Sequence, residues 1–162
     1  MGLVSWWNLF WEQNPQRALD YAIEVSKGKQ HNKIKIKTPF VLGAIIELGN
    51  CLNLIEAESL NILDAAYKVL YRTNEEAGLK MLQNQNSIRK LDCAVISYIH
   101  ESRKIENKTP YDSVRSAFNE GSEIYPGASF TVRNHIQICI RKHELIKGYF
   151  LPTPIKDFNP FL

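Results

Sequence analysis

Three segments of the chain space their apolar residues at the interval expected of helices. The first starts at Asn14-Pro15, where Asn suits an N-cap and Pro suits the first helical position, and Gly28 supplies a stop. The second carries an apolar stripe over Leu60–Tyr71, with acidic residues before it and basic residues at its end. In the third, the run at residues 93–99 is apolar enough that a strand stays open as an alternative. The predicted helices cover residues 15–27, 57–72 and 87–105.

From Tyr111 onward the apolar residues alternate with a period of two, which is typical of strands. Earlier in the chain, the apolar run at residues 39–48 predicts a central strand that is buried on both faces. The aromatic segment Met1–Trp11 is interpreted as a strand that is buried or faces a partner. The proline-containing tail at residues 153–162 is expected to run extended along the surface. The strands predicted after Tyr111 cover residues 113–118, 130–140 and 147–151.

These elements predict an α+β fold, in which helices pack on an antiparallel-rich sheet whose strands come from both ends of the chain. A chain of 162 residues is in the ordinary range for one domain and contains no repeat or linker. We therefore expect a single domain at residues 1–152, followed by the extended tail.

Composition narrows the class of protein. Hydrophobic residues make up 44% and charged residues 23%, which is typical of a globular chain, and a net charge of +3 is too small to indicate nucleic-acid binding. The lysines within residues 27–37 favour a solvated edge, although contact with phosphates stays open. Met1–Trp11 lacks the basic start of a signal peptide and is too short to span a bilayer. Together with three well-separated cysteines in apolar runs, this predicts a cytoplasmic protein with reduced thiols.

Most motifs for catalysis or metal binding are missing from the sequence. His100-Glu101 begins like a zinc-protease motif, but Lys104 occupies the position of the second ligand, so no metal site is predicted. The glycines are too scattered for a phosphate-binding loop, and no serine has the flanking glycines of a nucleophile elbow.

Two places could carry chemistry. Glu120 stands in the glycine-containing loop FNEGSEIYPG, and loops on rigid scaffolds often carry function, although an ordinary turn carboxylate is the simpler reading. His135 and Gln137 are two residues apart on a predicted strand, so their side chains project from the same face. A polar, outward-facing strand surface is an equally good explanation of that pair.

Several blocks of the sequence resemble an uncharacterised bacterial family related to ADP-ribosyltransferases. The blocks are LFWEQNPQRALDYA, FVLGAIIELGNCLNL, KLDCAVISYIHE, SAFNEGSEIYPGASF and HIQICIRKHELIKGYFLP. They occur in the order of the family and extend from residue 9 to about residue 152. The resemblance implies an ADP-ribosyltransferase-like fold, with NAD as the ligand.

Transferases of the poly(ADP-ribose) polymerase type hold NAD with a His, a Tyr and a Glu on three strands. The His belongs to an HG(S/T) segment that this sequence lacks, so the resemblance implies that the first strands of the family are missing. The Tyr falls on Leu9 and the Glu falls on Gln137. An amide there can hydrogen-bond to a ribose hydroxyl, but it lacks the charge that stabilises a cationic transition state.

The resemblance therefore implies a NAD-dependent mono-ADP-ribosyltransferase that is slow or inactive. Its expected catalytic positions are Gln137, His135 and Glu120. Its expected NAD contacts are Leu9, Phe10 and Tyr125. The alternative is a non-catalytic protein-interaction module of the same fold, whose exposed N-terminal edge binds a protein partner or a second copy. Trp6, Trp7, Phe10 and Trp11 would form that contact, since exposed apolar patches usually mark interfaces.

Overall fold

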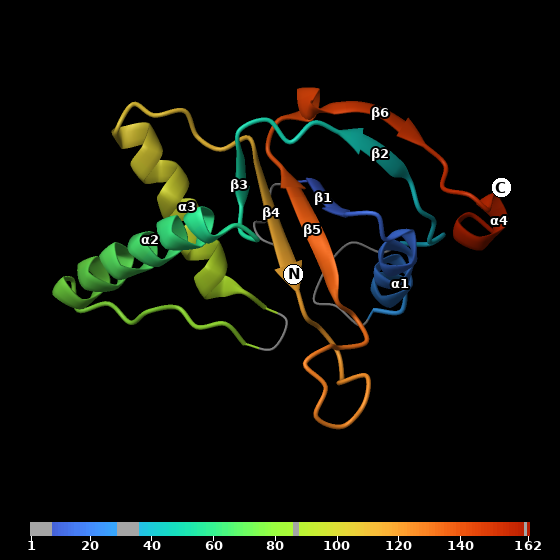
Figure 1. The fold of residues 1–162 in the computed structure, drawn as a ribbon, viewed down its shortest axis with the longest axis horizontal. Helices are drawn as coiled ribbons and strands as arrows, with labels where there is room; N and C mark the ends of the chain where they lie inside the picture. Colours follow the sequence, from blue (N-terminus) through green and yellow to red (C-terminus); the bar gives the residue numbers. More distant parts are fainter. Residues whose placement is uncertain (1–7, 29–35, 86–87, 161) are drawn as a thin grey trace.

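The computed structural model of the chain describes residues 8–28, 36–85, 88–160 and 162. Its elements make an α+β domain, as predicted (Figure 1). The helices are α1 (Pro15–Ser26), α2 (Ala57–Glu76), α3 (Lys90–Ile105) and α4 (Ile155–Phe158), with a turn of 3-10 helix at His143–Leu145. The strands are β1 (Asn8–Trp11), β2 (Gly43–Ile46), β3 (Cys51–Asn53), β4 (Ser113–Phe118), β5 (His135–Ile140) and β6 (Ile146–Phe150).

The strands form two sheets. The larger has four strands in the order β1-β5-β4-β3, and β2 pairs with β6 in a separate two-stranded sheet, here called the ribbon. All pairs are antiparallel except β3 with β4. α2 and α3 carry the chain from β3 to β4 and so supply the long crossover that a parallel pair requires.

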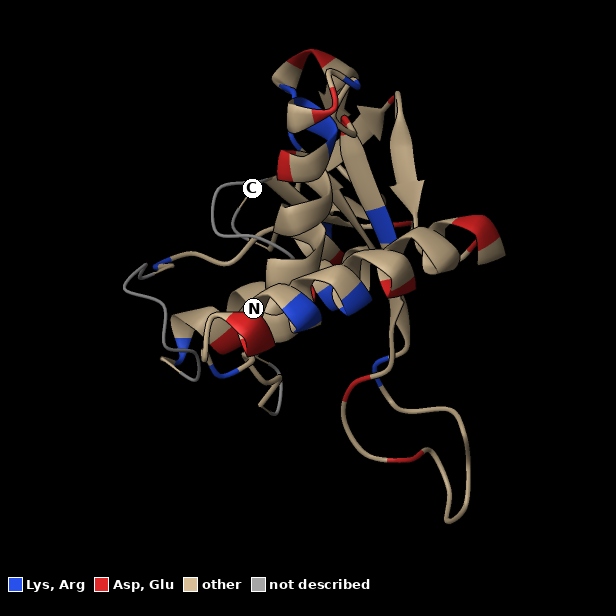
Figure 2. Cartoon of the chain, turned by 90° about the vertical axis from the view of Figure 1, so that its left-hand side faces the viewer, with Lys and Arg blue, Asp and Glu red and all other residues tan. Residues whose placement is uncertain are grey.

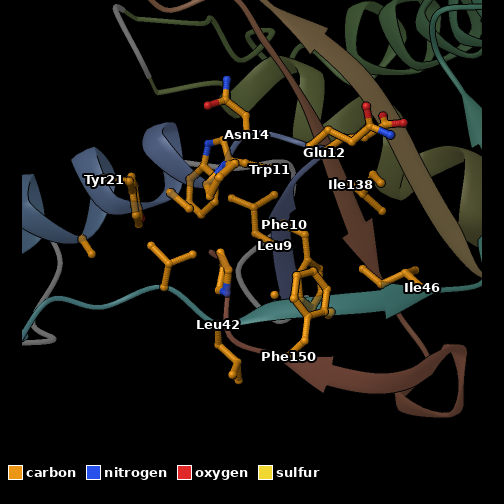
Figure 3. A pocket seen from close by; sticks show the side chains of 18 of the residues that line it. Leu9, Phe10, Trp11, Glu12, Asn14, Tyr21, Leu42, Ile46, Ile138 and Phe150 are labelled. Carbon is orange, nitrogen blue, oxygen red and sulfur yellow. The ribbon is translucent and has the colours of Figure 1, made fainter. Parts of the chain in front are cut away.

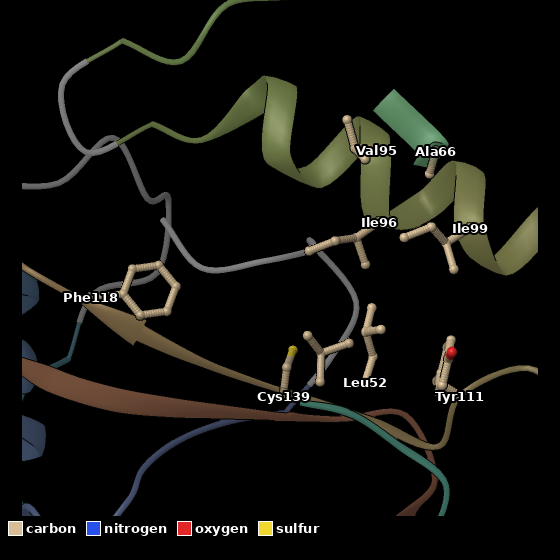
Figure 4. Packing of buried hydrophobic residues seen from close by; sticks show 9 residues of the cluster. Leu52, Ala66, Val95, Ile96, Ile99, Tyr111, Phe118 and Cys139 are labelled. Carbon is tan, nitrogen blue, oxygen red and sulfur yellow. The ribbon is translucent and has the colours of Figure 1, made fainter. Parts of the chain in front are cut away.

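A row of buried side chains crosses the larger sheet and anchors the two long helices. Leu52, Val114 and Cys139 are aligned on three neighbouring strands, and all three are almost completely buried. Ile96 of α3 and Ala66 of α2 belong to the same cluster (Figure 4). The helices therefore cover this face of the sheet, and burial there raises the pKa of the Cys139 thiol to about 12.

The opposite face of the sheet carries a second, smaller cluster. Ile138 and Ile140 of β5 pack there with Phe10 of β1 and with Ile46 and Leu48 from the ribbon side. The ribbon thus covers the face that α2 and α3 leave open, as Figure 1 shows. The sheet is the middle layer of the domain.

The predicted helices are confirmed, although α3 begins at Lys90 and not at residue 87, and both ends of α1 follow local signals. Asn14 caps α1, since its Oδ1 accepts the Arg17 N–H at 3.0 Å, and Pro15 is the first helical residue. Gly28 follows α1 with a φ of +70°, a conformation that glycine adopts without strain. α2 extends four residues beyond the predicted end, to Glu76. The strand alternative for residues 93–99 is wrong, because this stretch lies within α3.

The predicted central strand at residues 39–48 is wrong. Only Gly43–Ile46 are extended in a ladder, and they pair in the ribbon, where Ile45 is 60% exposed. The run is apolar because part of it lines a cavity and Val41 meets the end of the chain. The Val41 N–H donates to Oδ1 of the fully buried Asn159 at 3.1 Å.

Three further segments differ in detail from the sequence prediction. β3 follows Gly49 closely and is too short to show a period. Residues 130–134 form a loop in front of β5, which begins at His135. In place of an extended tail, Ile155–Phe158 form a turn of helix that lies near α1 (Figure 1). Trp6 and Trp7, with the lysines at 29, 33 and 35, lie outside the described residues.

The outer surface has two distinct regions. Acidic and basic residues are spaced along the exposed side of α2 (Figure 2). The loop between β4 and β5 projects away from the body in the same view. Within the described part of the chain, no helix is long and apolar enough to cross a membrane.

His100 of α3 is buried beside a cation. Nη1 of Arg141 donates to its Nδ1 at 2.8 Å and to the Tyr111 carbonyl at 3.1 Å. Burial, reinforced by the charge of Arg141, lowers the pKa of His100 from 6.5 to about 4. The imidazole is therefore neutral at neutral pH and accepts a hydrogen bond that a protonated ring could not accept.

This arrangement predicts a loss of stability in mild acid. The unfolded chain protonates His100 near pH 6.5 and the folded chain only near pH 4, so proton uptake favours unfolding as the pH falls through this window. The loss should reach up to about 3 kcal/mol. In His100→Asn, whose side-chain oxygen can accept from Arg141 without titrating, this part of the slope should vanish. Urea unfolding at several pH values measures both slopes, and equal slopes would contradict the assignment.

Gly43 provides a test of the ribbon. A Cβ at this position would lie 2.4–2.8 Å from ring carbons of Phe150, its cross-strand partner. Gly43→Ala should therefore displace the half-exposed ring and lower the free energy of unfolding by about 1 kcal/mol. Gly148→Ala, in the paired strand, meets nothing within 4 Å and is the matched control. Equal effects in chemical denaturation would argue against the close contact.

Candidate functional site

A cavity of about 590 Å³ lies between α1, β1 and the ribbon (Figure 3). This volume is in the range of about 300–1,000 Å³ that is common for small-molecule sites. Aromatic side chains from β1, α1, β6 and the segment before β2 contribute to its walls: Phe10, Trp11, Tyr21, Phe40 and Phe150. The remaining wall is mostly aliphatic, so the cavity is chiefly apolar.

The sequence of α1 keeps this space open. Ala18 and Ala22 present small side chains to the cavity, one turn apart on the helix. Tyr21 lies beside them and packs against Trp11 of β1, with ring centroids 4.8 Å apart and planes tilted by 44°. The two rings together form an aromatic corner where the helix meets the edge of the sheet (Figure 3).

One charged side chain borders the cavity among the described residues, and it is already paired. Glu12 accepts two hydrogen bonds from Arg115, at 2.7 Å from Nε and 3.2 Å from Nη2. Nη1 of the same guanidinium lies 3.3 Å from Oδ1 of Asn53. The hydrogen bond to Glu12 holds the pKa of Arg115 above its ordinary value. This bidentate pair ties the end of β1 to β4.

The predicted polar residues of β5 lie together in a buried contact. The Nδ1–H of His135 donates to the Arg133 carbonyl at 2.7 Å, because a carbonyl can only accept. Its Nε2 is then free to accept from Nε2 of Gln137 at 2.8 Å. The imidazole stacks on Phe118, and burial lowers its pKa although the Arg133 carbonyl and Glu120 oppose the shift. Because its pKa is lowered, His135 is neutral at neutral pH.

Glu120 lies at the base of the projecting loop, where two ion pairs join that loop to α1. Arg17 Nη2 and Glu120 Oε2 are 3.1 Å apart, and Arg133 Nη2 and Glu24 Oε1 are 2.6 Å apart. The Arg133 N–H also donates to the Glu120 carbonyl at 3.1 Å, which closes the base of the loop. We call this pair of ion pairs the loop clamp. Arg17 is only 6% exposed, so its charge depends on Glu120 for compensation.

The cavity and the polar contact lie on opposite faces of β5. Ile138 lines the cavity, whereas Gln137 and His135 project from the other face, since side chains alternate along a strand. Leu9 and Phe10, the expected NAD contacts on β1, do line the cavity. Tyr125 does not, because it is 59% exposed on the projecting loop. The structure therefore brings His135 and Gln137 together, with the charge of Glu120 acting on His135, and separates them from Leu9 and Phe10 at the cavity.

Sequence reasoning missed several of the residues that build these places. Nothing in the sequence near Arg17 marks it as part of an ion pair, since its partner Glu120 is 103 positions away. No motif singles out Tyr21 or Glu12 in the sequence either. The aromatic density around Trp11 was the one visible signal, and it pointed to the right segment.

No protein-family model, curated protein or solved structure matches this chain. Among residues 8–28, 36–85 and 88–160, no three His, Cys, Asp or Glu side chains gather closely enough to hold a metal ion.

The buried ion pair of the loop clamp should contribute more to the free energy of unfolding than an exposed ion pair on α3. Glu120→Gln should lower the free energy of unfolding by about 2 kcal/mol, because it leaves the buried Arg17 guanidinium without a carboxylate. Glu101→Gln removes an exposed partner of Lys104 and should have no measurable effect. Urea denaturation compares the two variants. A Glu120→Gln protein as stable as Glu101→Gln would show that the Arg17–Glu120 pair contributes nothing to stability.

Proposed function

We propose that this domain is a NAD-binding module of the ADP-ribosyltransferase type, with the cavity as its binding site. The observation that carries the proposal is the aromatic-walled cavity itself, which borders α1 directly after Pro15. The resemblance of the sequence blocks implies a NAD groove between this helix and the strand around Gln137. Leu9 and Phe10, two of the implied contacts, line the cavity, and so does Ile138 of that strand. A chiefly apolar pocket with a few polar groups at its edge is the usual form of a cofactor site.

The side chains favour binding over rapid transfer. The implied glutamate position is Gln137, which carries no charge to stabilise a developing cation. It is also hydrogen-bonded to His135 and projects from the face of β5 opposite the cavity wall at Ile138. Slow mono-ADP-ribosyl transfer is therefore the upper limit of the proposed activity.

A second candidate function rests on the edge of the larger sheet. β1 is the outer strand of this sheet, with β5 as its one neighbour among the described strands. An unpaired strand edge can accept a strand from another chain. A non-catalytic module that binds a protein partner or a second copy through β1 is consistent with this position.

The NAD proposal predicts a thermal shift that depends on the cavity. Millimolar NAD should raise the melting temperature, because a ligand that binds only the folded state stabilises it, by about 2.7 kcal/mol at a hundredfold excess over Kd. Ala18→Leu, which fills the cavity from α1, should abolish the shift. Ala65→Leu makes the same change on the exposed side of α2 and should retain it. The absence of a shift in the wild type would overturn the proposal.

Nicotinamide release over hours separates a binding module from an enzyme. A shift without release supports the binding module, and release that the cavity-filling variant Ala18→Leu abolishes supports an enzyme. If neither signal is seen, light scattering tests the strand-edge candidate, because a dimer would support self-association through β1.

A further inference from the structure

The side chains that line the cavity can pack against a flat ring but cannot compensate the charge of a phosphate. Trp11 and Tyr21 meet at an angle of 44° in one corner, and Phe10 and Phe150 border the same space (Figure 3). Aromatic side chains interact favourably with other rings in offset or edge-to-face arrangements. Between them, Ile46 and Ile138 supply aliphatic surface that gains from covering an apolar group.

A phosphate would find no cation in these walls. Among the described residues that line the cavity, neither Lys nor Arg is present, and Glu12 is the one charged side chain. Its carboxylate would repel a phosphate, and its partner Arg115 already directs Nε and Nη2 to Glu12 and Nη1 towards Asn53. Moving a phosphate into such a space would leave its charge without compensation.

The start of α1, which borders the cavity, is also a poor anion site. Helix N-termini bind phosphates through N–H groups that the helix leaves unpaired. Here Pro15 has no N–H, and the N–H of Arg17 donates to Oδ1 of Asn14. The Ala18 N–H is satisfied by the Asn14 carbonyl. The cap that defines the helix has therefore used most of the donors that a phosphate would need.

Side-chain amides remain at the same end of the cavity. Gln13 and Asn14 both border it, and an amide provides donors as well as acceptors without a net charge. Such groups suit the ring nitrogens and carboxamides of uncharged heterocycles. These amides would orient a bound ring through hydrogen bonds without attracting an ion.

We infer that the cavity recognises one uncharged, flat heteroaromatic ring and leaves any phosphate of its ligand in solvent. The inference rests on the proposed function in placing the nucleotide ligand here, and it assigns the recognised part of that ligand. In NAD this ring is the adenine base, because the nicotinamide ring carries a positive charge there, and the base packs in the corner of Trp11 and Tyr21. The diphosphate of a dinucleotide contributes almost nothing to affinity.

Isothermal titration with four probes tests this assignment: adenosine, nicotinamide, NAD and inorganic pyrophosphate. We expect at least one ring probe to bind with a Kd within about tenfold of that of NAD, a difference of about 1.4 kcal/mol. Pyrophosphate should not bind. Raising the salt concentration from 0.05 to about 0.5 M should change the Kd of NAD less than about threefold, because screening acts on charge contacts.

A matched pair of tyrosine variants locates the ring. Tyr21→Leu keeps an apolar side chain but removes the aromatic face, and it should weaken binding of the ring probe by about tenfold. Tyr67→Leu, on the exposed side of α2, should leave the Kd unchanged. Circular dichroism of both variants confirms that the fold is retained.

The outcomes separate this inference from the proposed function. NAD binding that is more than about a hundredfold tighter than either ring probe and is lost in salt would overturn the inference and leave the NAD site in place. Ring binding without NAD binding would support the inference and overturn the proposed ligand. Failure of both ring probes to bind overturns the inference.

Discussion

The layers of this domain meet at β5, whose side chains alternate between two unlike surroundings. Cys139 faces the helices α2 and α3, while Ile138 and Ile140 face the ribbon. β1 and β4 pair with β5 along its two edges, so its backbone is satisfied on both sides. A shift of register by one residue would exchange the two faces and bring Gln137 into the apolar cluster under the ribbon. The positions of the cavity and of the loop clamp both depend on this register.

α1 gives these two features a common support. One side of the helix carries Ala18 and Ala22 along the cavity, and a neighbouring side carries Arg17 and Glu24 to the loop clamp. The helix is itself held by local forces, through the Asn14 cap and its packing on β1. Because one helix borders the cavity and also holds the surface loop, a displacement of α1 would change both of them.

The helices could be predicted from the sequence because their signals are local. A cap at Asn14 and apolar stripes at helical spacing act within a few residues, and so does the alternation that identified β4 and the pairing of His135 with Gln137. The predictions that were wrong or missing concern segments whose structure depends on distant parts of the chain. The apolar run at residues 39–48 looks like a central strand until the ribbon and Asn159 are seen beside it. No local pattern connects Arg17 to Glu120, or shows which face of β5 borders a cavity.

The pairing of β1 with β5 also has a consequence for the order in which the molecule assembles. Leu9 is aligned with Cys139, so this part of the sheet joins segments from far ends of the described chain. Contacts of such high contact order form slowly, since a long loop must close before they gain any energy. During synthesis β1 emerges well before β5. Until β5 is made, the aromatic side chains of β1 lack their neighbouring strand in the sheet. Helices α2 and α3 can form in that interval, whereas the cavity is completed only when β5 and β6 arrive. The cavity is therefore among the last parts of the fold to form, and until then the aromatic residues of β1 are open to misassociation in a nascent chain.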